Sequence, residues 1–199
     1  MHPAPIYGQA EPAPLLAHLA AFPFVTLAAA PGGRLLVAHA PVVVRADAPG
    51  LALDFHLSRR NALAEALSAG VRAVAISLAA EAYVSPDWYQ SADQVPTWNY
   101  VSVEAEGPVA ALDDAGLVRL LDDLSAQEEA RLAPKPPWTR GKMSAGRFTT
   151  MTGSIVGARM SIERLDGTSK LSQDKAAADR AGVIAALGDH PIARRMRGL

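Results

Sequence analysis

Alternating hydrophobic and polar positions predict strands through most of the first half of the chain. Phe24–Ala30 and Leu35–Val44 are apolar runs separated by a Pro-Gly-Gly-Arg segment, which is typical of a turn between paired strands. Leu51–Leu57 and Val71–Ala79 continue as a third and a fourth strand. Thr97–Leu112 then returns to strand-like alternation, so the pattern predicts a small β-rich core.

Helical spacing is confined to short stretches between these strands and near the ends. The predicted helices are Glu11–Ala21, Asn61–Ala69, Asp113–Leu132, Ala145–Met151 and Asp174–Leu187. Because the helices are short connectors, a small antiparallel barrel with peripheral helices is favoured over a βαβ sheet.

Four further segments complete the prediction. Ile155–Leu165 is expected to form a strand, and Asp47–Gly50 a turn. Ala82–Pro96 combines aromatic, proline, serine and aspartate residues without a period, which is typical of a functional loop. Ala133–Pro137 is proline-rich but too short to require separate domains.

Length, composition and charge narrow the class of protein. A chain of 199 residues favours one compact domain, and the absence of cysteine excludes disulfides and Cys-ligated metals. The start resembles no secretory signal and no long apolar run is present, so a cytoplasmic protein without membrane spans is expected. The net charge of −1 gives no global attraction to nucleic acid.

Metal and hydrolase chemistry have little support in the sequence. The five histidines show no close metal-ligand spacing, and G-x-S-x-G, P-loop and G-x-G-x-x-G motifs are absent. One of His39 and His56 could line a pocket, although structural histidines are commoner. The tail His190–Arg197 carries three arginines, and we expect a solvated or subunit-binding tail more than a DNA contact.

The first candidate site is Ser58-Arg59-Arg60-Asn61, where a predicted strand passes into a predicted helix. Guanidinium groups, a hydroxyl and the free N–H groups of a helix start are what a phosphate group needs. Capping by Ser58 or Asn61, with both arginines in solvent, is the more frequent explanation of such a segment.

The second candidate is Val95–Val101, at the start of a strand. Trp98 and Tyr100 could form the apolar wall of a ring-binding pocket, with Thr97 and Asn99 supplying polar contacts. Packing of the two aromatic residues in a core or a dimer interface explains the same pattern equally well.

The third candidate is Gly167–Asp174, a polar segment before the last predicted helix. Lys170 could neutralise a phosphate or carboxylate, and Gln173 could bond to a polar ligand. Alternatively Ser172 or Asp174 caps the helix and Lys170 is a solvated charge, which the spacing alone favours.

Seven segments together resemble proteins of the PaiB type. They are Phe22–Leu27, His39–Pro41, His56–Asn61, Ala82–Tyr89, Val95–Tyr100, Lys170–Gln173 and Ala178–Val183. Each is short, but their order is the same as in that family, and together they cover nearly the whole chain. The chain departs from the family pattern at Asp174, where asparagine is usual, at Ala40, where leucine is usual, and in a short loop before Val95.

The resemblance implies a fold, a cofactor and a set of site residues. It implies a mainly β split barrel of the FMN-binding type, antiparallel and dimeric. We expect a single domain, residues 1–199, with a C-terminal helical extension from about residue 174. FMN is the implied cofactor, bound at a homodimer interface. The implied phosphate end is Ser58, Arg59, Arg60 and Asn61, the implied pocket wall is Thr97, Trp98 and Asn99, and Lys170 and Gln173 would close the site.

Three functional hypotheses follow. Family members are commonly labelled negative transcriptional regulators, which suggests a flavin-binding regulator that acts through a ligand or a partner. An FMN-dependent oxidoreductase acting on a small substrate is the first alternative, because the flavin itself would supply the hydride chemistry. Direct DNA binding by the dimer is the second, although no DNA-reading element is recognisable in the sequence. No catalytic residue is assigned.

Overall fold

A computed structural model describes residues 4–46, 50–67 and 70–199 of the chain. Its internal contacts divide the chain into two compact units, which are described separately. The barrel unit comprises Leu19–Ile76 and Ala105–Arg164, and the terminal unit comprises Met1–His18, Ser77–Glu104 and Leu165–Leu199.

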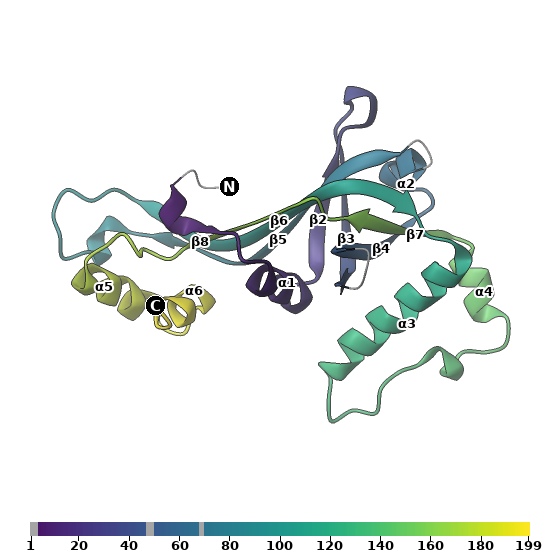
Figure 1. Ribbon diagram of the computed structural model, residues 1–199. Helices are drawn as coiled ribbons and strands as arrows, with labels where there is room; N and C mark the ends of the chain where they lie inside the picture. Colours follow the sequence, from purple (N-terminus) through teal and green to yellow (C-terminus); the bar gives the residue numbers. More distant parts are fainter. Residues whose placement is uncertain (1–3, 47–49, 68–69) are drawn as a thin grey trace. The chain divides into compact units, whose positions relative to one another are not determined.

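The described residues form eight strands and six α-helices (Figure 1). The strands are β1 (Gly8–Gln9), β2 (Phe24–Ala29), β3 (Leu36–Arg45), β4 (Ala52–Ser58), β5 (Val71–Val84), β6 (Thr97–Ala111), β7 (Ile155–Ser161) and β8 (Arg164–Lys170). The helices are α1 (Pro12–Ala21), α2 (Ala62–Ala66), α3 (Asp114–Ala130), α4 (Arg147–Thr152), α5 (Ala177–Leu187) and α6 (Pro191–Met196). The long strands β5 and β6 each contribute residues to both units.

Six strands close the barrel unit. Their order is β6-β5-β2-β3-β4-β7, and β7 also pairs with β6, so the sheet returns to its first strand. The pairs β2–β3, β3–β4, β4–β7 and β6–β7 are antiparallel. Leu53, Phe55 and Leu57 alternate along β4 and are buried, as expected for residues that face the interior of a small barrel. The predicted antiparallel barrel is confirmed.

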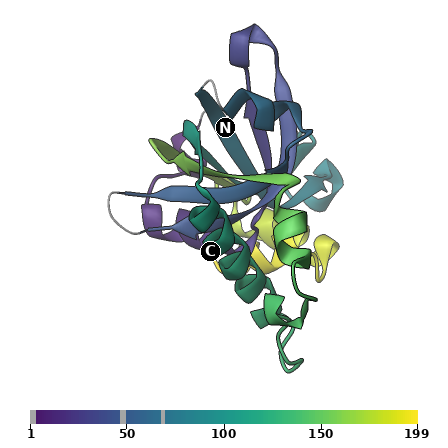
Figure 2. The ribbon, with the colours of Figure 1, turned by 90° about the vertical axis from the view of Figure 1, so that its right-hand side faces the viewer.

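Helix α3 packs against β3, β4 and β7 on the outer side of the barrel (Figure 2). Asp113 caps the helix, since its carboxylate accepts a hydrogen bond from the Gly116 N–H at 2.6 Å. Leu117 and Leu120 of this helix are buried. The helix predicted over Asp113–Leu132 therefore forms, with Asp113 as its N-cap.

A buried ionic cluster lies on β3, β4 and β7 of the barrel unit. The Asp54 carboxylate accepts hydrogen bonds from Arg45 Nε at 2.8 Å and from Arg159 Nε and Nη2 at 2.7 and 2.8 Å. Arg45 also pairs with Asp123 of α3 at 2.6 Å, which ties that helix to the sheet. Burial opposes ionisation of Asp54, but the two arginines outweigh it and lower the pKa of this carboxyl.

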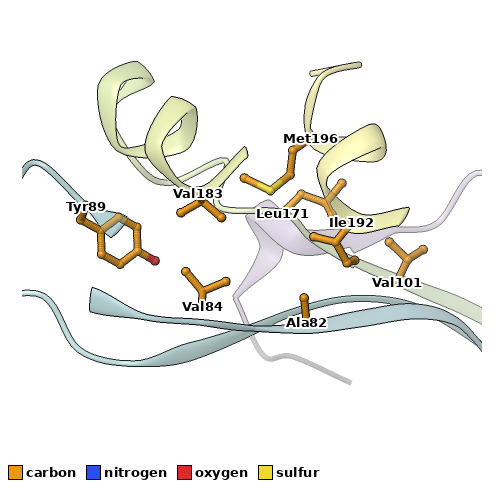
Figure 3. Packing of buried hydrophobic residues seen from close by; sticks show 8 residues of the cluster. All are labelled: Ala82, Val84, Tyr89, Val101, Leu171, Val183, Ile192 and Met196. Carbon is orange, nitrogen blue, oxygen red and sulfur yellow. The ribbon is translucent and has the colours of Figure 1, made fainter. Parts of the chain in front are cut away.

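The terminal unit has a hydrophobic core of its own (Figure 3). Strand β1 pairs with β8, and helices α5 and α6 contribute apolar residues to a cluster that also takes side chains from β5 and β6. The cluster consists of Ala82, Val84, Tyr89, Val101, Leu171, Val183, Ile192 and Met196.

Two strand boundaries differ from the prediction. The strand predicted over Val71–Ala79 continues to Val84, so the first residues of the predicted loop Ala82–Pro96 are sheet. Ala82 and Val84 alternate with exposed neighbours and are buried in the terminal-unit core. The strand predicted over Ile155–Leu165 is two strands, β7 and β8. Residues 167–170, the first half of the polar candidate segment Gly167–Asp174, belong to β8.

The C-terminal prediction also requires correction. Helix α5 begins at Ala177, and neither Ser172 nor Asp174 caps it, because its N-cap is Ala176. The tail from His190 was predicted to be solvated or to bind another subunit, but it forms α6, in which Ile192 and Met196 are buried within the chain. The three arginines of the tail obscured this short amphipathic pattern.

Some expectations lie outside what the structure tests. The turn predicted at Asp47–Gly50 lies almost entirely outside the described residues, as does the end of the helix predicted over Asn61–Ala69. The single-domain assignment stays a prediction. No helix in the described ranges has the length and apolar character needed to cross a membrane. Among those same residues, no group of three or more potential ligands is placed to hold a metal ion.

Buried His18 and partly buried His56 are expected to lower the stability of the fold on mild acidification. Burial lowers the pKa of both His18 and His56, so the unfolded chain binds protons before the folded chain does. The free energy of unfolding should be highest above about pH 6.5, the pKa of histidine in the unfolded chain, and should fall as the pH drops below that value. We expect a lower urea midpoint at about pH 5.5 than at about pH 7.5, and a smaller difference in His56→Gln. Equal differences in both proteins would contradict a role for His56.

Candidate functional site

Arg59 lies at the end of β4 and is fixed by the segment before β7. Its backbone N–H donates to the Ser154 carbonyl at 3.0 Å, and its Nε donates to the Gly153 carbonyl at 2.9 Å. The terminal guanidinium nitrogens form no hydrogen bond with the described residues. The side chain is therefore oriented while most of its donors stay available.

Arg59 lines a cavity of about 480 Å³ in the barrel unit. Arg140, Thr149, Thr152 and Asp114 line the same cavity, so two guanidinium groups, two hydroxyl-bearing side chains and one carboxylate border one volume. Such a donor set suits a phosphate group. Arg140 was not singled out from the sequence, because it lies far along the chain from Arg59 in a segment predicted only as a connection.

The neighbours of Arg59 have local structural contacts. The Asn61 side-chain oxygen accepts from the Leu63 N–H at 2.9 Å and caps α2, which is the capping explanation given above. The Ser58 hydroxyl accepts from the Arg60 N–H at 3.3 Å. The structure thus places Arg59 in the cavity lining, whereas Ser58, Arg60 and Asn61 are not among its lining residues.

Thr97, Asn99 and Lys170 come together in the terminal unit. They line a cavity of about 120 Å³ with Tyr7, Tyr89, Val95, Ser172, Asp174 and Lys175. Lys170 Nζ donates to the Thr97 hydroxyl at 2.5 Å and lies 5.9 Å from the centre of the Tyr7 ring. Lys170 forms no ion pair within the described ranges, so its charge is available to an anionic group.

Asn99 is fully buried and is held by Ser172. The Asn99 amide nitrogen donates to the Ser172 hydroxyl at 2.9 Å and lies 3.6 Å from the Met196 sulfur. Ser172 has a positive φ of 58°, a conformation that side chains other than glycine and asparagine rarely adopt. The surroundings impose this backbone angle, and it brings the hydroxyl to the buried amide.

Two tyrosines complete this cavity and were not identified from the sequence. Burial, followed by the nearby Asp174 carboxylate, raises the pKa of Tyr7 to about 12. Burial also raises the pKa of Tyr89, whose hydroxyl oxygen is buried without a hydrogen bond to the described residues. Both hydroxyls therefore stay protonated at neutral pH. A buried hydroxyl without a partner is costly, and a bound polar group would remove that cost.

Trp98 and Gln173 do not line the cavity. Trp98 points to the other side of β6, is 52% exposed, and packs edge-on against Tyr83 with ring centres 6.0 Å apart. The Gln173 side chain folds back on its own loop, accepting from the Leu171 N–H at 2.6 Å and donating to the Ser169 carbonyl at 2.5 Å. Their predicted contacts with a cofactor remain predictions.

Comparison with known proteins identifies the family. Residues 1–164 match the family described as "Putative FMN-binding domain". The chain belongs to this family. The match includes Ser58–Asn61 and Thr97–Asn99 and ends before Lys170 and Gln173. This FMN-binding family member is therefore a flavin-binding protein, with FMN or a related flavin as its cofactor.

Curated relatives agree with this assignment. A 120-residue segment is 31% identical to protease synthase and sporulation protein PAI 2 of Bacillus subtilis, covering 59% of this chain and 56% of that protein. This similarity confirms the resemblance to PaiB-type proteins. An alignment of length 120 gives 33% identity to an uncharacterized protein of Aspergillus fumigatus and covers 51% of this chain and 46% of that protein. The chain spans about half the length of the curated relatives it matches.

Solved structures share the fold at low sequence identity. A FAD- and heme-binding protein from Mycobacterium smegmatis aligns with a TM-score of 0.62 and 19% identity, over 92% of this chain and 82% of that one. A flavocytochrome from Azotobacter vinelandii aligns with a TM-score of 0.58 and 16% identity, over 91% and 78% of the two chains. These similarities support the split-barrel fold.

The side chains present fit the needs of a flavin nucleotide. A phosphate requires fixed positive charge and donors, which Arg59, Arg140 and the threonines provide in the barrel unit. The polar edge of a ring requires a few fixed donors, which Lys170 and the Tyr89 hydroxyl offer in the terminal unit. Each set of residues therefore has chemistry that the family's cofactor demands.

Proposed function

We propose that this protein binds FMN through the residues described above and acts as a regulator that responds through a ligand or a partner. The observation that carries the proposal is the family match over residues 1–164, together with the donor cavity around Arg59. Arg59, in the barrel unit, would hold the phosphate. The bound flavin supplies redox chemistry, and the protein supplies binding and orientation.

The absorbance spectrum of the purified protein tests flavin binding directly. We expect a flavin spectrum, or saturable FMN binding by calorimetry when the purified protein is colourless. Absence of both would contradict the proposal. Anaerobic mixing with NADPH separates regulation from catalysis, because reduction of the bound flavin faster than that of free FMN would favour the oxidoreductase alternative.

Removing the charge of Arg59 should weaken FMN binding. A hydrogen bond to a charged group contributes about 1.5–3 kcal/mol, so Arg59→Gln is expected to raise the FMN dissociation constant about 10- to 100-fold. Arg60→Gln is the matched control, because Arg60 is exposed and does not line the cavity. Isothermal titration calorimetry measures both. Equal affinities in the two variants would contradict the placement of the phosphate at Arg59.

A homodimer is the second part of the proposal. Phe24, Val37 and Ile76 share one face of the β3-β2-β5 sheet, because Val37 pairs with Ala28 and Ile76 pairs with Thr26. The three side chains are 69%, 61% and 37% exposed. An exposed apolar sheet face of this kind is typical of a protein interface, and a second copy can pair the same face with itself.

A charge on this face should prevent self-association. We expect a dimer for the native chain and a monomer for Val37→Glu, measured by light scattering after size-exclusion chromatography, because a desolvated carboxylate without a partner opposes burial of the face. Leu132→Glu is the control, since Leu132 is 55% exposed and lies outside the β3-β2-β5 face. A monomeric native chain would contradict the proposal.

Direct DNA binding stays the alternative route to regulation. Among the tail arginines, Arg197 already donates to the Gly188 carbonyl at 2.6 Å, so part of the expected basic tail is engaged within the fold. A mobility-shift assay at several salt concentrations tests it, because phosphate contacts weaken as salt rises. No specific shift at low salt would leave regulation to a ligand or a partner.

A further inference from the structure

A further cavity, separate from the two described above, lies beside α3 in the barrel unit. It has a volume of about 350 Å³ and is enclosed by α3, the segment 138–143, α4 and the start of β7. Its apolar lining is Leu121, Trp138, Met143, Phe148, Met151 and Ile155. Two aromatic side chains and two methionines give walls that suit a flat apolar molecule, and methionine adapts to its outline.

Polar contacts hold the outer wall of this cavity in place. After α3 the chain runs back along the helix towards α4 (Figure 1). The Trp138 N–H donates to the Glu129 carboxylate at 2.8 Å, and Arg140 pairs with Asp122 at 3.2 Å. These contacts tie Trp138 and Arg140 to α3, so the cavity is present in the folded chain before any ligand binds.

Two polar side chains of the lining have unused hydrogen-bonding capacity. The His56 side chain forms no hydrogen bond with the described residues, and its Nδ1 is buried. A neutral imidazole carries one donor and one acceptor, and leaving such groups unpaired costs free energy. Arg140 lies 5.2 Å from the centre of the Phe148 ring, and its exposed pair with Asp122 occupies few of its five N–H donors.

We propose that this cavity binds a flat aromatic molecule that carries an anionic group, with the ring against Trp138 and Phe148 and the anion at Arg140. The ligand class follows from the lining, since the walls are apolar and aromatic and Arg140 is the cationic group among the lining residues, next to the Asp122 carboxylate with which it pairs. His56 adds a neutral hydrogen-bonding group for a polar substituent on the ring.

The proposed ligand site goes beyond flavin binding and does not require it. Arg140, Phe148 and Thr152 line both this cavity and the one around Arg59, whereas His56, Trp138 and Met143 line only the former. Arg59 does not line the cavity beside α3, so a ligand with its ring at Trp138 and its anion at Arg140 leaves Arg59 to the flavin phosphate. A regulator that acts through a small molecule would have its ligand site here.

The test uses 2-naphthoate as the probe and the full chain, with and without saturating FMN, in calorimetric titrations. We expect one saturable site, with affinities that agree within about threefold whether FMN is present or absent. Ser125→Trp should fill the cavity and weaken binding at least about tenfold, because a large side chain in a formed pocket excludes the ring. Leu132→Trp adds the same side chain outside the cavity and should leave the affinity unchanged.

Arg140→Gln tests the anionic group without filling the cavity. It should weaken 2-naphthoate about tenfold and leave the neutral 2-naphthalenemethanol within about threefold of the native affinity. No saturable binding of either probe, equal binding by Ser125→Trp and the native chain, or competitive displacement by FMN would each overturn the proposal. The visible flavin absorbance of the same samples reports flavin binding separately, so failure here is distinguishable from failure of the proposed function.

Discussion

Replacing Asp54 with asparagine is expected to destabilise the barrel unit by about 3 kcal/mol or more. Asp54 is 2% exposed, and its carboxylate is the common acceptor for Arg45 and Arg159. The substitution removes the negative charge that the two guanidinium groups share, although Arg45 keeps its ion pair with Asp123. Removing one partner of a buried charge cluster costs more than the intact cluster contributes, because the remaining charges stay partly desolvated. Urea unfolding followed by circular dichroism measures the change.

The exposed ionic cluster of the same unit is the matched control. Glu106 accepts from Arg72 and from Arg164, as Asp54 does from its two arginines, but the Glu106 side chain is 32% exposed and that of Asp54 is 3% exposed. Exposed pairs contribute little because water and salt screen them, so Glu106→Gln should leave the urea midpoint nearly unchanged. Similar losses in both variants would show that burial is not the cause of the Asp54 effect.

Gly182→Ala should destabilise the terminal unit although alanine favours helices. A Cβ at position 182, within α5, would lie 2.0 Å from the Trp88 carbonyl oxygen. The contact involves backbone, so the helix must move, and overpacking of this kind costs about 1–3 kcal/mol. That cost exceeds the gain of about 1 kcal/mol from the better helix propensity of alanine.

Gly198→Ala controls for the added methyl group in the same unit. Its Cβ would lie no closer than 3.5 Å to the Arg195 carbonyl oxygen, which is ordinary contact. Thermal unfolding of both variants, followed by tryptophan fluorescence, should therefore show a loss for Gly182→Ala alone. A stabilised Gly182→Ala would mean that α5 does not pack closely on the turn at Trp88.

The strands of the barrel could be predicted because each shows alternating apolar and polar residues or is bounded by a turn sequence. Leu53, Phe55 and Leu57 alternate along β4, and the Pro31–Gly33 turn marks the hairpin of β2 and β3. The two-residue strand β1 and the short helix α6 carry too few residues for a period to be visible. Their structure depends on contacts with β8 and with the terminal-unit core, which sequence spacing does not encode.

The site was predictable only in part for a related reason. Lys170 and Thr97 were singled out through the order of the PaiB-type motifs, and the structure places their polar atoms 2.5 Å apart. Tyr7 lies in a segment with no such signal, whereas Tyr89 ends one of the PaiB-type segments but was assigned no role there, and the cavity lining identifies both. Trp98 was chosen together with Thr97, but strand alternation sends adjacent side chains to opposite faces.

Ser172 has a left-handed backbone conformation, so a substitution there that raises the stability of the fold is expected to lower its affinity for a ligand. Glycine at this position would relax the backbone, yet it would remove the hydroxyl to which the fully buried Asn99 amide donates. Selection for heat resistance alone could therefore favour Ser172→Gly, which leaves the Asn99 amide in the wall of the cavity without its hydrogen-bond partner Ser172. Thermostable variants altered at position 172 should therefore be screened for ligand affinity as well as for melting temperature.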